Sequence, residues 1–327
     1  MIIVTGGAGF IGSNILAGLE QLGEKNLVAV DHADAALQNL SKRNLTDFIA
    51  PDALSEFCSK NQPNIRAIIH MGATSSTMIT DASLFVRNNY LYSLMLWRWC
   101  AKYRVPFIYA SSAATYGSGS MGFDDNASTI KELAQFQPLN FYGRSKNLFD
   151  RRVAHEIARK HQLPPQWVGL KFFNVYGPNE YHKGNQKSVI ATIFPDALAG
   201  RPVKLFKSHD PAYKDGGQLR DFVWVGDCVQ VILWLLENPR VNGIFNVGSG
   251  KSRSFSALAK SVFTALGGQL SIEYIDMPIQ LRAKYQYFTQ ANMSRLRDQG
   301  YNSLSTSLED GVKTYVQNFL MKKDPYL

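Results

Sequence analysis

Residues 5–12 read Thr-Gly-Gly-Ala-Gly-Phe-Ile-Gly and stand between an apolar run at residues 2–5 and a helical pattern over residues 11–22. A strand, a glycine-rich turn and a helix in this order allow main-chain amides to approach a pyrophosphate at the positive end of the helix. A glycine-rich turn alone is common, but here the strand comes before it and the helix follows it. The stretch therefore predicts the first βα unit of a dinucleotide-binding fold.

An acidic residue follows this turn at the spacing that dinucleotide folds use. The glycines are Gly6, Gly9 and Gly12, and Asp31 ends the next apolar run 19 residues after the last of them. That is the position of the carboxylate that binds the adenosine ribose. Because a carboxylate accepts a hydrogen bond from a ribose 2′-hydroxyl and repels a 2′-phosphate, Asp31 favours NAD.

Nearby cations leave the choice between NAD and NADP open. His32, Lys42 and Arg43 could offset the repulsion of a 2′-phosphate if they fold over the adenosine ribose. A solvated helix end is at least as good an interpretation of Lys42 and Arg43. The residues alone therefore predict a nicotinamide dinucleotide without fixing which one.

The first half of the chain alternates apolar runs with helical patterns. This order predicts an α/β fold with a Rossmann-like, doubly wound parallel sheet whose strands are buried on both faces. We expect a dinucleotide-binding domain at residues 1–170, to which residues 220–250 return, and a smaller, interleaved C-terminal substrate-binding domain at residues 171–327. The expected strands are residues 2–5, 27–30, 67–70, 107–110, 168–172, 203–206, 222–225 and 244–247, and the expected helices are residues 11–22, 52–60, 77–103, 189–198, 226–237 and one that follows Tyr142.

Composition excludes several classes of protein. The 327 residues carry a net charge of +9, but the basic residues are dispersed without interleaved aromatics, which favours a small anionic ligand over nucleic acid. Three distant cysteines and scattered histidines give neither a disulfide framework nor zinc spacing, so we expect no metal. No apolar run approaches the ~18 residues that a membrane span needs, and no secretory signal is visible. We expect a cytoplasmic protein that does not bind a membrane.

Two side chains suited to proton transfer lie one helical turn apart. Tyr142 and Lys146 are i and i+4 in a predicted helix, so they share one face. A lysine ammonium at this spacing lowers the pKa of a phenol, which suits the phenol to proton exchange with an alcohol. The pair occurs by chance in many helices, but Ser111 and Ser112 end the fourth predicted strand, at the edge where open α/β sheets place their sites. A serine hydroxyl there can hydrogen-bond the same substrate oxygen.

These residues together resemble the extended short-chain dehydrogenase/reductase family. The match consists of the glycine spacing, Ser112, Tyr142, Lys146, the segment FNVYGP at residues 173–178, and RDFV at residues 220–223 with Asp227. One branch of the family, whose members epimerise nucleotide sugars, is matched more closely. Its shared segments are ASSAATYG at residues 110–117, HKG at 182–184, KLF at 204–206 and YQYFTQA at 285–291. The resemblance covers almost the whole chain.

The resemblance implies a role for each matching residue. Ser112, Tyr142 and Lys146 correspond to the catalytic triad, and Lys183 corresponds to a second acid or base at the sugar. The implied cofactor is NADP, with NAD as the alternative, and the implied partner is a small nucleotide sugar bound by a homo-oligomer. The implied cofactor contacts are Gly6, Gly9, Phe10, Ile11, Gly12, Asp31, His32, Met71, Gly72, Ala73, Thr74, Ser75, Asn88, Lys146, Val175 and Lys183. The implied substrate contacts are Ser112, Asn174, Asn185, Thr192, Phe206, Arg220 and Tyr285.

Several of these residues also have plainer interpretations. Arg220 suits a bidentate clamp on a diphosphate, but it could instead form a salt bridge with Asp221 or Asp227. Phe206 could stack on a nucleotide base or fill the core of the smaller domain. Lys183 stands on a glycine-flanked segment that we expect to be a loop, where a lysine could simply be solvated.

Four features depart from the family pattern. Met71 stands where a carboxylate is expected, His32 where asparagine is expected, and Thr192 where the family has a substrate-binding histidine. The interval between Ser112 and Tyr142 is several residues longer than usual. These departures concern the adenosine pocket and the fit of the sugar, and they leave the triad chemistry untouched.

The implied activity is epimerisation at C6 of an ADP-linked heptose, by transient oxidation to a ketone, for the inner core of lipopolysaccharide. Another nucleotide-sugar epimerase, such as a UDP-hexose 4-epimerase, would keep the same residues. A dehydratase is less well supported, because Ala113 and Ala114 stand where those enzymes have Asp-Glu. A non-catalytic dinucleotide-binding regulator is the alternative from another class, and the intact Ser112, Tyr142 and Lys146 set argues against it.

Overall fold

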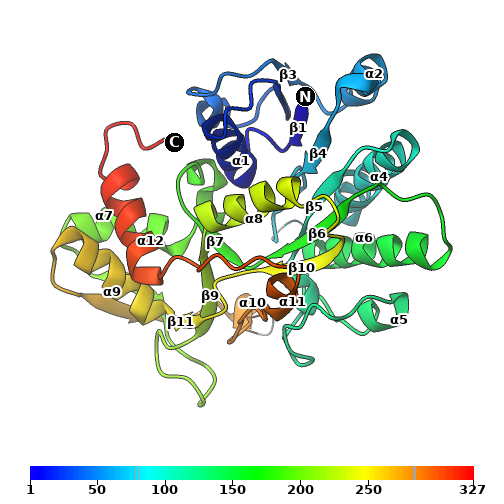
Figure 1. Cartoon of the computed structure of the whole chain (residues 1–327). Coiled ribbons are helices and arrows are strands. Elements are labelled where there is room, and N and C mark those ends of the chain that lie inside the picture. The colour runs from blue at the N-terminus through cyan, green and yellow to red at the C-terminus, as the bar shows by residue number, and fades with distance from the viewer. Residues whose placement is uncertain (78, 80, 283–284) are drawn as a thin grey trace.

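The computed structural model describes residues 1–77, 79, 81–282 and 285–327, and its largest feature is a parallel β-sheet (Figure 1). Within the described residues the sheet has seven strands in the order β10-β6-β5-β4-β1-β2-β3, and all neighbouring strands are parallel. The strand order runs outward in opposite directions from β1 and β4, which confirms the doubly wound α/β fold and places its switch point between them. The strands are β1 (Ile2–Thr5), β2 (Leu27–Val30), β3 (Asp47–Ile49), β4 (Ala67–His70), β5 (Phe107–Ser112), β6 (Trp167–Phe172) and β10 (Gly243–Val247).

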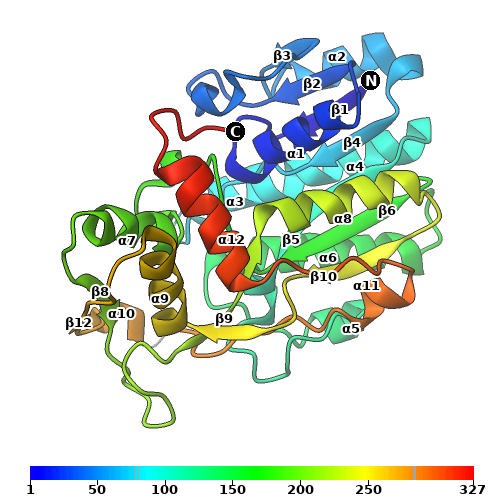
Figure 2. The ribbon, with the colours of Figure 1, turned by 60° about the vertical axis from the view of Figure 1, so that its left-hand side comes forward.

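Apolar side chains cover both faces of this sheet, which is why its strands are continuous apolar runs. In β1, Ile2 and Val4 belong to one buried cluster, whereas Ile3 belongs to another. The first cluster is covered by α1 and α8, which lie side by side in Figure 2, and the second by α2, α4 and α6. These helices are α1 (Phe10–Gln21), α2 (Leu54–Asn61), α4 (Tyr92–Tyr103), α6 (Phe141–Ala158) and α8 (Val225–Glu237).

The chain comes back to the main sheet late in the sequence. β10 pairs with β6, from Gly243 opposite Val168 to Val247 opposite Phe172, and α8 packs on α1. The last expected apolar run therefore forms the edge strand next to β6. The domain boundary at residue 170 remains a prediction.

A second group of elements packs around its own apolar core and gathers at the left of Figure 1. A three-stranded sheet of order β11-β9-β7 adjoins it, because Tyr176 of β7 and Phe222 of β9 lie in this core. This is the region that we expect to bind the substrate. Its elements are β7 (Asn174–Tyr176), α7 (Val189–Leu198), β8 (Val203–Phe206), β9 (Leu219–Trp224), β11 (Ser252–Ser254), α9 (Phe255–Leu266), β12 (Ile272–Ile275) and α12 (Leu308–Tyr315).

The structure differs from the expected elements in a few places. The helix expected over residues 77–103 is described from Ala82, and a π-helical turn at Val86–Leu91 joins α3 (Ala82–Phe85) to α4. Residues 78 and 80 lie outside the described residues. The segment at 181–186 is a 3-10 helix, where we expect a loop. Three further short helices are α5 (Ile130–Leu133), α10 (Ile279–Arg282) and α11 (Ser294–Asp298). Among the helices that the structure describes, none has the length and apolar character to cross a membrane.

Candidate active site

The glycine-rich turn has the geometry that a dinucleotide requires. Gly6 has a φ of +66°, and a Cβ at Gly12 would collide with the Gly6 carbonyl oxygen. Gly9 begins α1 without a side-chain cap, so the first-turn amides, starting at Phe10 and Ile11, have no competing side-chain acceptor at the cap position. Uncapped amides at a helix N-terminus bind phosphate groups. The turn therefore fits a pyrophosphate.

Asp31 lies against this turn, as the sequence predicts. Its Oδ2 accepts a hydrogen bond from the Ala8 amide (3.0 Å), and its Oδ1 accepts one from the His32 amide (2.9 Å). The carboxylate at the end of β2 is therefore fixed beside the dinucleotide turn. The His32 side chain itself is exposed.

Arg43 and Lys42 each form an ion pair with a carboxylate. Arg43 Nη1 lies 2.7 Å from Glu20 Oε2. Glu20 is in the last turn of α1, roughly 15 Å along the helix from its beginning. Lys42 pairs with Asp324 at 2.9 Å. Of the two interpretations left open for Arg43, the structure shows neither a contact with the glycine-rich turn among the described residues nor a freely solvated side chain, because its guanidinium pairs with Glu20.

Asn39 is a site residue that the sequence did not reveal. Its buried Nδ2 donates hydrogen bonds to the carbonyl oxygens of Ala8 (2.8 Å) and Asn179 (3.0 Å), and it lies 3.3 Å from His182 Nδ1. Asn39 thus ties the dinucleotide turn to the segment that carries Lys183. Nothing in a lone asparagine on a short 3-10 helix distinguishes it before the fold is known.

The loop after β4 forms the second wall of the cofactor site. The amides of Met71 and Gly72 donate to the main-chain oxygen (3.0 Å) and the side-chain Oγ1 (3.2 Å) of Thr5, respectively. A Cβ at Gly6 would collide with Gly72, so the two loops touch. Met71 packs its side chain against the apolar core, which explains physically why an apolar residue stands where a carboxylate is expected.

The π-helical turn holds the rest of that loop. Asn88 Nδ2 donates to Thr74 Oγ1 (2.9 Å), and the Asn89 side chain accepts from the Thr74 amide (2.8 Å) and donates to Ser145 Oγ (2.9 Å). Ala73 is half-buried and Ser75 is exposed beside them. Asn89 was not predicted, although a π-helical turn within a helix often marks a functional site.

Ser112, Tyr142 and Lys146 come together at the carboxyl end of β5. Ser112 lies close enough to Tyr142 to lower the pKa of its phenol, and Lys146 Nζ lies 6.0 Å from the centroid of the Tyr142 ring. Lys146 Nζ also donates to the carbonyl oxygen of Ala110 at 2.7 Å. Asn140 fixes the start of α6, because its Oδ1 accepts from the Gly143 amide at 2.8 Å. The predicted triad geometry is thus present, while its catalytic role remains a prediction.

Burial dominates the electrostatics of this triad. It lowers the pKa of Lys146 to about 8, against the opposing attraction of Asp150. It raises the pKa of Tyr142, and the hydrogen bond from Ser112 offsets only part of that rise. The expectation that Lys146 lowers the phenol pKa therefore does not hold for the protein by itself, because desolvation of the phenolate is the larger effect.

Lys183 lies in the 3-10 helix Tyr181–Gln186, and its Nζ is 5.3 Å from the centroid of the Phe10 ring. Burial lowers its pKa, and Glu180 partly opposes this. No hydrogen bond joins Lys183 to Tyr142 among the described residues. The structure therefore places Lys183 at the beginning of α1, where we expect it to contact the cofactor. Asn185, in the same helix, is exposed.

Arg220 is a buried guanidinium without a carboxylate partner among the described residues. Its Cζ lies 5.0 Å from the ring centroid of Tyr285 and 5.7 Å from that of Phe255. The carboxylates that could have paired with it are occupied, because Asp221 accepts hydrogen bonds from Ser249, Gly250 and Ala291, and Asp227 accepts them from Thr306. The salt-bridge interpretation of Arg220 is therefore wrong.

The other predicted residues of the second half of the chain lie on β7, β8 and α7. Asn174, exposed in β7, accepts a hydrogen bond from Thr289 Oγ1 at 3.4 Å. Val175 follows it in β7, opposite Val223 of β9. Phe206 is half-buried at the end of β8. Thr192, exposed on α7, donates its hydroxyl to the Ser188 carbonyl oxygen (3.0 Å) and contacts none of the other predicted substrate residues through a hydrogen bond.

Comparisons with known proteins extend this picture. Residues 2–248 match the family described as the NAD dependent epimerase/dehydratase family. ADP-L-glycero-D-manno-heptose-6-epimerases of Nitratidesulfovibrio vulgaris (strain DP4) and Fusobacterium nucleatum subsp. nucleatum are each 46% identical to this chain, with 100% of both chains covered. The crystal structure of the Helicobacter pylori ADP-L-glycero-D-manno-heptose-6-epimerase superposes with a TM-score of 0.78 at 27% identity, over 97% of this chain and 95% of that one.

Proposed function

Because this chain belongs to the NAD dependent epimerase/dehydratase family, we propose that it inverts C6 of ADP-D-glycero-D-manno-heptose to give the L-glycero epimer. Full-length relatives with that name support the reaction. The observation that carries it here is the presence, in one chain, of a Ser112–Tyr142–Lys146 arrangement and of a buried Arg220 guanidinium that has no carboxylate partner among the described residues. The product would serve the inner core of lipopolysaccharide.

In the proposed reaction, hydride transfer depends on the dinucleotide and proton transfer depends on the triad. The bound dinucleotide supplies the acceptor that takes a hydride from C6 and returns it, so that no net oxidation occurs. Tyr142 exchanges the proton of the C6 hydroxyl, and Ser112 hydrogen-bonds the same oxygen. Lys146 supplies the positive charge that favours the phenolate while the proton is away.

Lys183 is the proposed second acid or base. Inversion at C6 requires the oxygen to be deprotonated in one pose and reprotonated in a rotated one, because one nicotinamide face serves both hydride transfers. Tyr142 serves the first pose, and a second group is needed where the phenol does not reach. Lys183 fits that role chemically, because burial lowers the pKa of its ammonium and so makes it a better proton donor and acceptor.

Arg220 is the proposed clamp on the ADP diphosphate. A guanidinium offers parallel N–H donors to phosphate oxygens, and burial strengthens that attraction. Tyr285 lines its other side and can stack on the adenine or sugar. We propose that the contacts with the nucleotide sugar are completed by Asn174, Asn185, Thr192 and Phe206.

A nicotinamide dinucleotide is the family's cofactor, and its form is the finer proposal. We propose NADP on the resemblance described above. The residues near the expected ribose position favour NAD instead, since the Asp31 carboxylate is fixed at the turn and Arg43 is held by Glu20. Denaturing the purified protein and weighing the released ligand by mass spectrometry decides between NADP and NAD.

We further propose a homo-oligomer in the cytoplasm that acts on a small molecule and binds no nucleic acid. Light scattering of the purified protein measures its mass against the 36.6 kDa of one chain. A mass of one chain at micromolar concentration would reject the oligomer.

The test of the function compares three substrates with one control. The protein is incubated with ADP-D-glycero-D-manno-heptose, UDP-galactose and ADP-glucose, and products are separated by chromatography. We expect the L-glycero heptose from the first only, and none from Tyr142→Phe. Conversion of UDP-galactose alone would make the protein a hexose 4-epimerase. Turnover of none, with bound dinucleotide present, would favour a regulator.

A further inference from the structure

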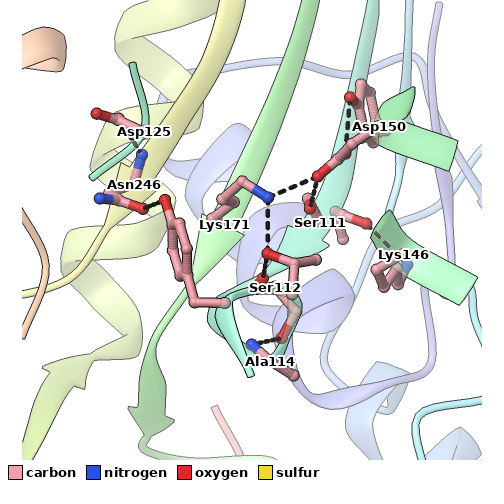
Figure 3. Close-up of polar contacts among 12 residues, drawn as sticks. Ser111, Ser112, Ala114, Asp125, Lys146, Asp150, Lys171 and Asn246 are labelled. Atoms are coloured by element: carbon pink, nitrogen blue, oxygen red, sulfur yellow. Dashed lines mark hydrogen bonds and ion pairs between the residues drawn. The ribbon is translucent and has the colours of Figure 1, made fainter. Parts of the chain in front are cut away.

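An ion pair lies fully buried directly behind the triad, and the proposed chemistry does not use it. Lys171 Nζ is 2.6 Å from Asp150 Oδ2, with the side chains 1% and 0% exposed (Figure 3). Asp150 stands one helical turn after Lys146 on α6, on the same face, and Lys171 comes from β6. A buried ion pair contributes little net stability compared with well-packed apolar residues of the same volume. Stability alone therefore gives no reason for these charges.

The pair contacts β5, the strand that ends at the triad serine. Asp150 accepts hydrogen bonds from Ser111 Oγ (2.7 Å) and from the Tyr109 hydroxyl (3.0 Å). Lys171 donates to Thr115 Oγ1 (2.7 Å), and Thr115 donates in turn to the Ser112 carbonyl oxygen (2.8 Å). Figure 3 shows these bonds converging on the end of β5. Both members of the pair therefore help to fix Ser112, Asp150 through the neighbouring Ser111 and Lys171 through Thr115.

Few groups around Lys146 carry charge near neutral pH. On α6 it faces Tyr142 and Asp150; on β4, burial lowers the pKa of His70 to about 3, so that imidazole is neutral. On β5 and the turn after it, burial raises the pKa values of Tyr109 and Tyr116 well above their usual range. The charged set is Lys146, Asp150 and Lys171.

We propose that Asp150 is a positioning residue for the triad: it keeps Lys146 in its charged form and fixes Ser112 opposite Tyr142, and Lys171 is the counter-charge that moderates it. The inference rests on the proposed function for the roles of Tyr142 and Lys146. Two cations share one carboxylate here, so each cation weakens the hold of Asp150 on the other. Removing either charge of the pair therefore shifts the protonation of Lys146, and in opposite directions.

Three variants test this. Asp150→Asn keeps the acceptor for Ser111 and removes the negative charge that raises the pKa of Lys146, so that pKa falls from about 8. Lys171→Gln leaves Asp150 to Lys146 alone, so the pKa of Lys146 rises. Each shift should be about one pH unit, the lower end of the effect of a nearby charge on a pKa. The double variant, a neutral pair of similar volume, should lie between them.

The measurement is a pH titration by NMR of protein labelled with carbon-13 lysine, with the Lys146 resonance identified by its loss in Lys146→Met. Glu156→Gln is the matched control, because it removes another buried carboxylate of α6 that pairs with Arg152, and it should leave the Lys146 midpoint unchanged. If Asp150→Asn does not fold, the direction of the shift in Lys171→Gln still decides. An unchanged midpoint, or shifts of both variants in the same direction, would overturn the inference.

A second readout separates this inference from the proposed function. The alkaline limb of the epimerisation profile should move with the Lys146 midpoint, to lower pH in Asp150→Asn and to higher pH in Lys171→Gln. A structural role alone would lower the rate at every pH without moving the limb. If the Lys146 midpoint moves in opposite directions in the two variants but the protein epimerises no heptose, the proposed function is refuted and the electrostatic coupling is supported. If the protein epimerises the heptose but the midpoint does not move, the coupling is refuted and the proposed function is supported.

Discussion

Tyr142 and Lys183 are the two side chains whose roles depend most on the proposed rotation of the substrate ketone. Their surroundings differ: Tyr142 lies near Ser112 at the end of β5, whereas Lys183 packs over Phe10 at the start of α1. If each serves one pose of the C6 oxygen, each should be needed for inversion and neither for binding the cofactor.

Tyr142→Phe and Lys183→Met should each reduce epimerisation by ~10²–10⁴-fold, the usual cost of losing a positioned acid or base. Single-turnover oxidation of each C6 epimer, followed by nicotinamide absorbance, should show that each variant retains one of the two half-reactions. Lys187→Met is the control, because Lys187 ends the same segment. Parent-like epimerisation by Lys183→Met would leave Tyr142 as the only acid and base.

Arg220→Ala should weaken the binding of ADP, measured by calorimetry, by about 2–5 kcal/mol, because it removes a buried charge that pairs with a diphosphate. Affinity for the dinucleotide should stay at the parent value, since Arg220 lies on β9 and the glycine-rich turn on β1 and α1. Arg201→Ala removes an exposed arginine that pairs with Asp196 and should change neither affinity. Equal affinity for ADP in Arg220→Ala and the parent would give Arg220 a structural role.

Asp31→Asn should shift the ratio of NADP to NAD affinity towards NADP, because it removes the repulsion of a 2′-phosphate and keeps the acceptor for the Ala8 amide. Fluorescence titration of cofactor-free protein measures both affinities. Asp34→Asn, which changes an exposed carboxylate three residues along, is the control. A ratio that does not move would show that Asp31 does not face the ribose.

At the scale of elements, the buried network between β1, β4 and α4 links both walls of the cofactor site. His70 Nδ1 lies 2.6 Å from Thr5 Oγ1, and His70 Nε2 lies 2.8 Å from Ser93 Oγ. Ser93 donates to the main-chain oxygen of Asn89 at 2.8 Å, in the π-helical turn. A neutral imidazole bridges the elements, since burial, and then Lys146, lowers the pKa of His70 to about 3.

This network should make the fold sensitive to acid. The unfolded chain protonates His70 below its ordinary pKa of 6.5, whereas the folded protein does not protonate it until about pH 3. Stability is therefore complete above pH 6.5 and falls as the pH drops towards 3, by about 2 kcal/mol between pH 6.5 and about pH 5. Urea unfolding across this range should show a shallower pH dependence in His70→Gln. Equal slopes in the two proteins would mean that His70 is protonated in the folded state.

The way in which an element is buried determines whether the sequence predicts it. β1, β2 and β4 have the predicted bounds, because a parallel strand buried on both faces is a continuous apolar run. β3 and β7 have three residues each, too few for such a run to stand out. The π-helical turn in front of α4 leaves no mark in periodicity, because its neighbours on both sides are helical.

The site was predictable where a motif fixes a residue, and not where the fold brings distant residues together. Tyr142 and Lys146 are four residues apart, and their shared face follows from helix geometry alone. The partner of Arg43 could not be predicted in this way, since Glu20 approaches it only when β2 and α1 are in place. Asp150 is also one turn from Lys146, but the role proposed for it depends on Lys171. Lys171 reaches Asp150 only because β5 and β6 pair with Ser111 opposite Lys171.

At the scale of the whole molecule, the dinucleotide turn and Arg220 belong to different sheets. The turn and the triad belong to the main sheet, whereas Arg220 lies on β9 of the three-stranded sheet, beside Tyr285. The end of the chain contacts both groups of elements: Lys42 pairs with Asp324 (2.9 Å), and the Tyr181 hydroxyl donates to the Pro325 carbonyl oxygen (2.9 Å).

The central claim is that C6 is inverted by removal of its hydride and return of the same hydride to the opposite face of the C6 carbonyl, chemistry that a bound nicotinamide would supply. ADP-D-glycero-D-manno-heptose carrying deuterium at C6 tests it directly when the product is examined by NMR and mass spectrometry. The account predicts the L-glycero epimer with its deuterium still at C6, and no deuterium in the solvent. Loss of the label to water, or recovery of only the starting epimer from protein that carries its dinucleotide, would contradict it.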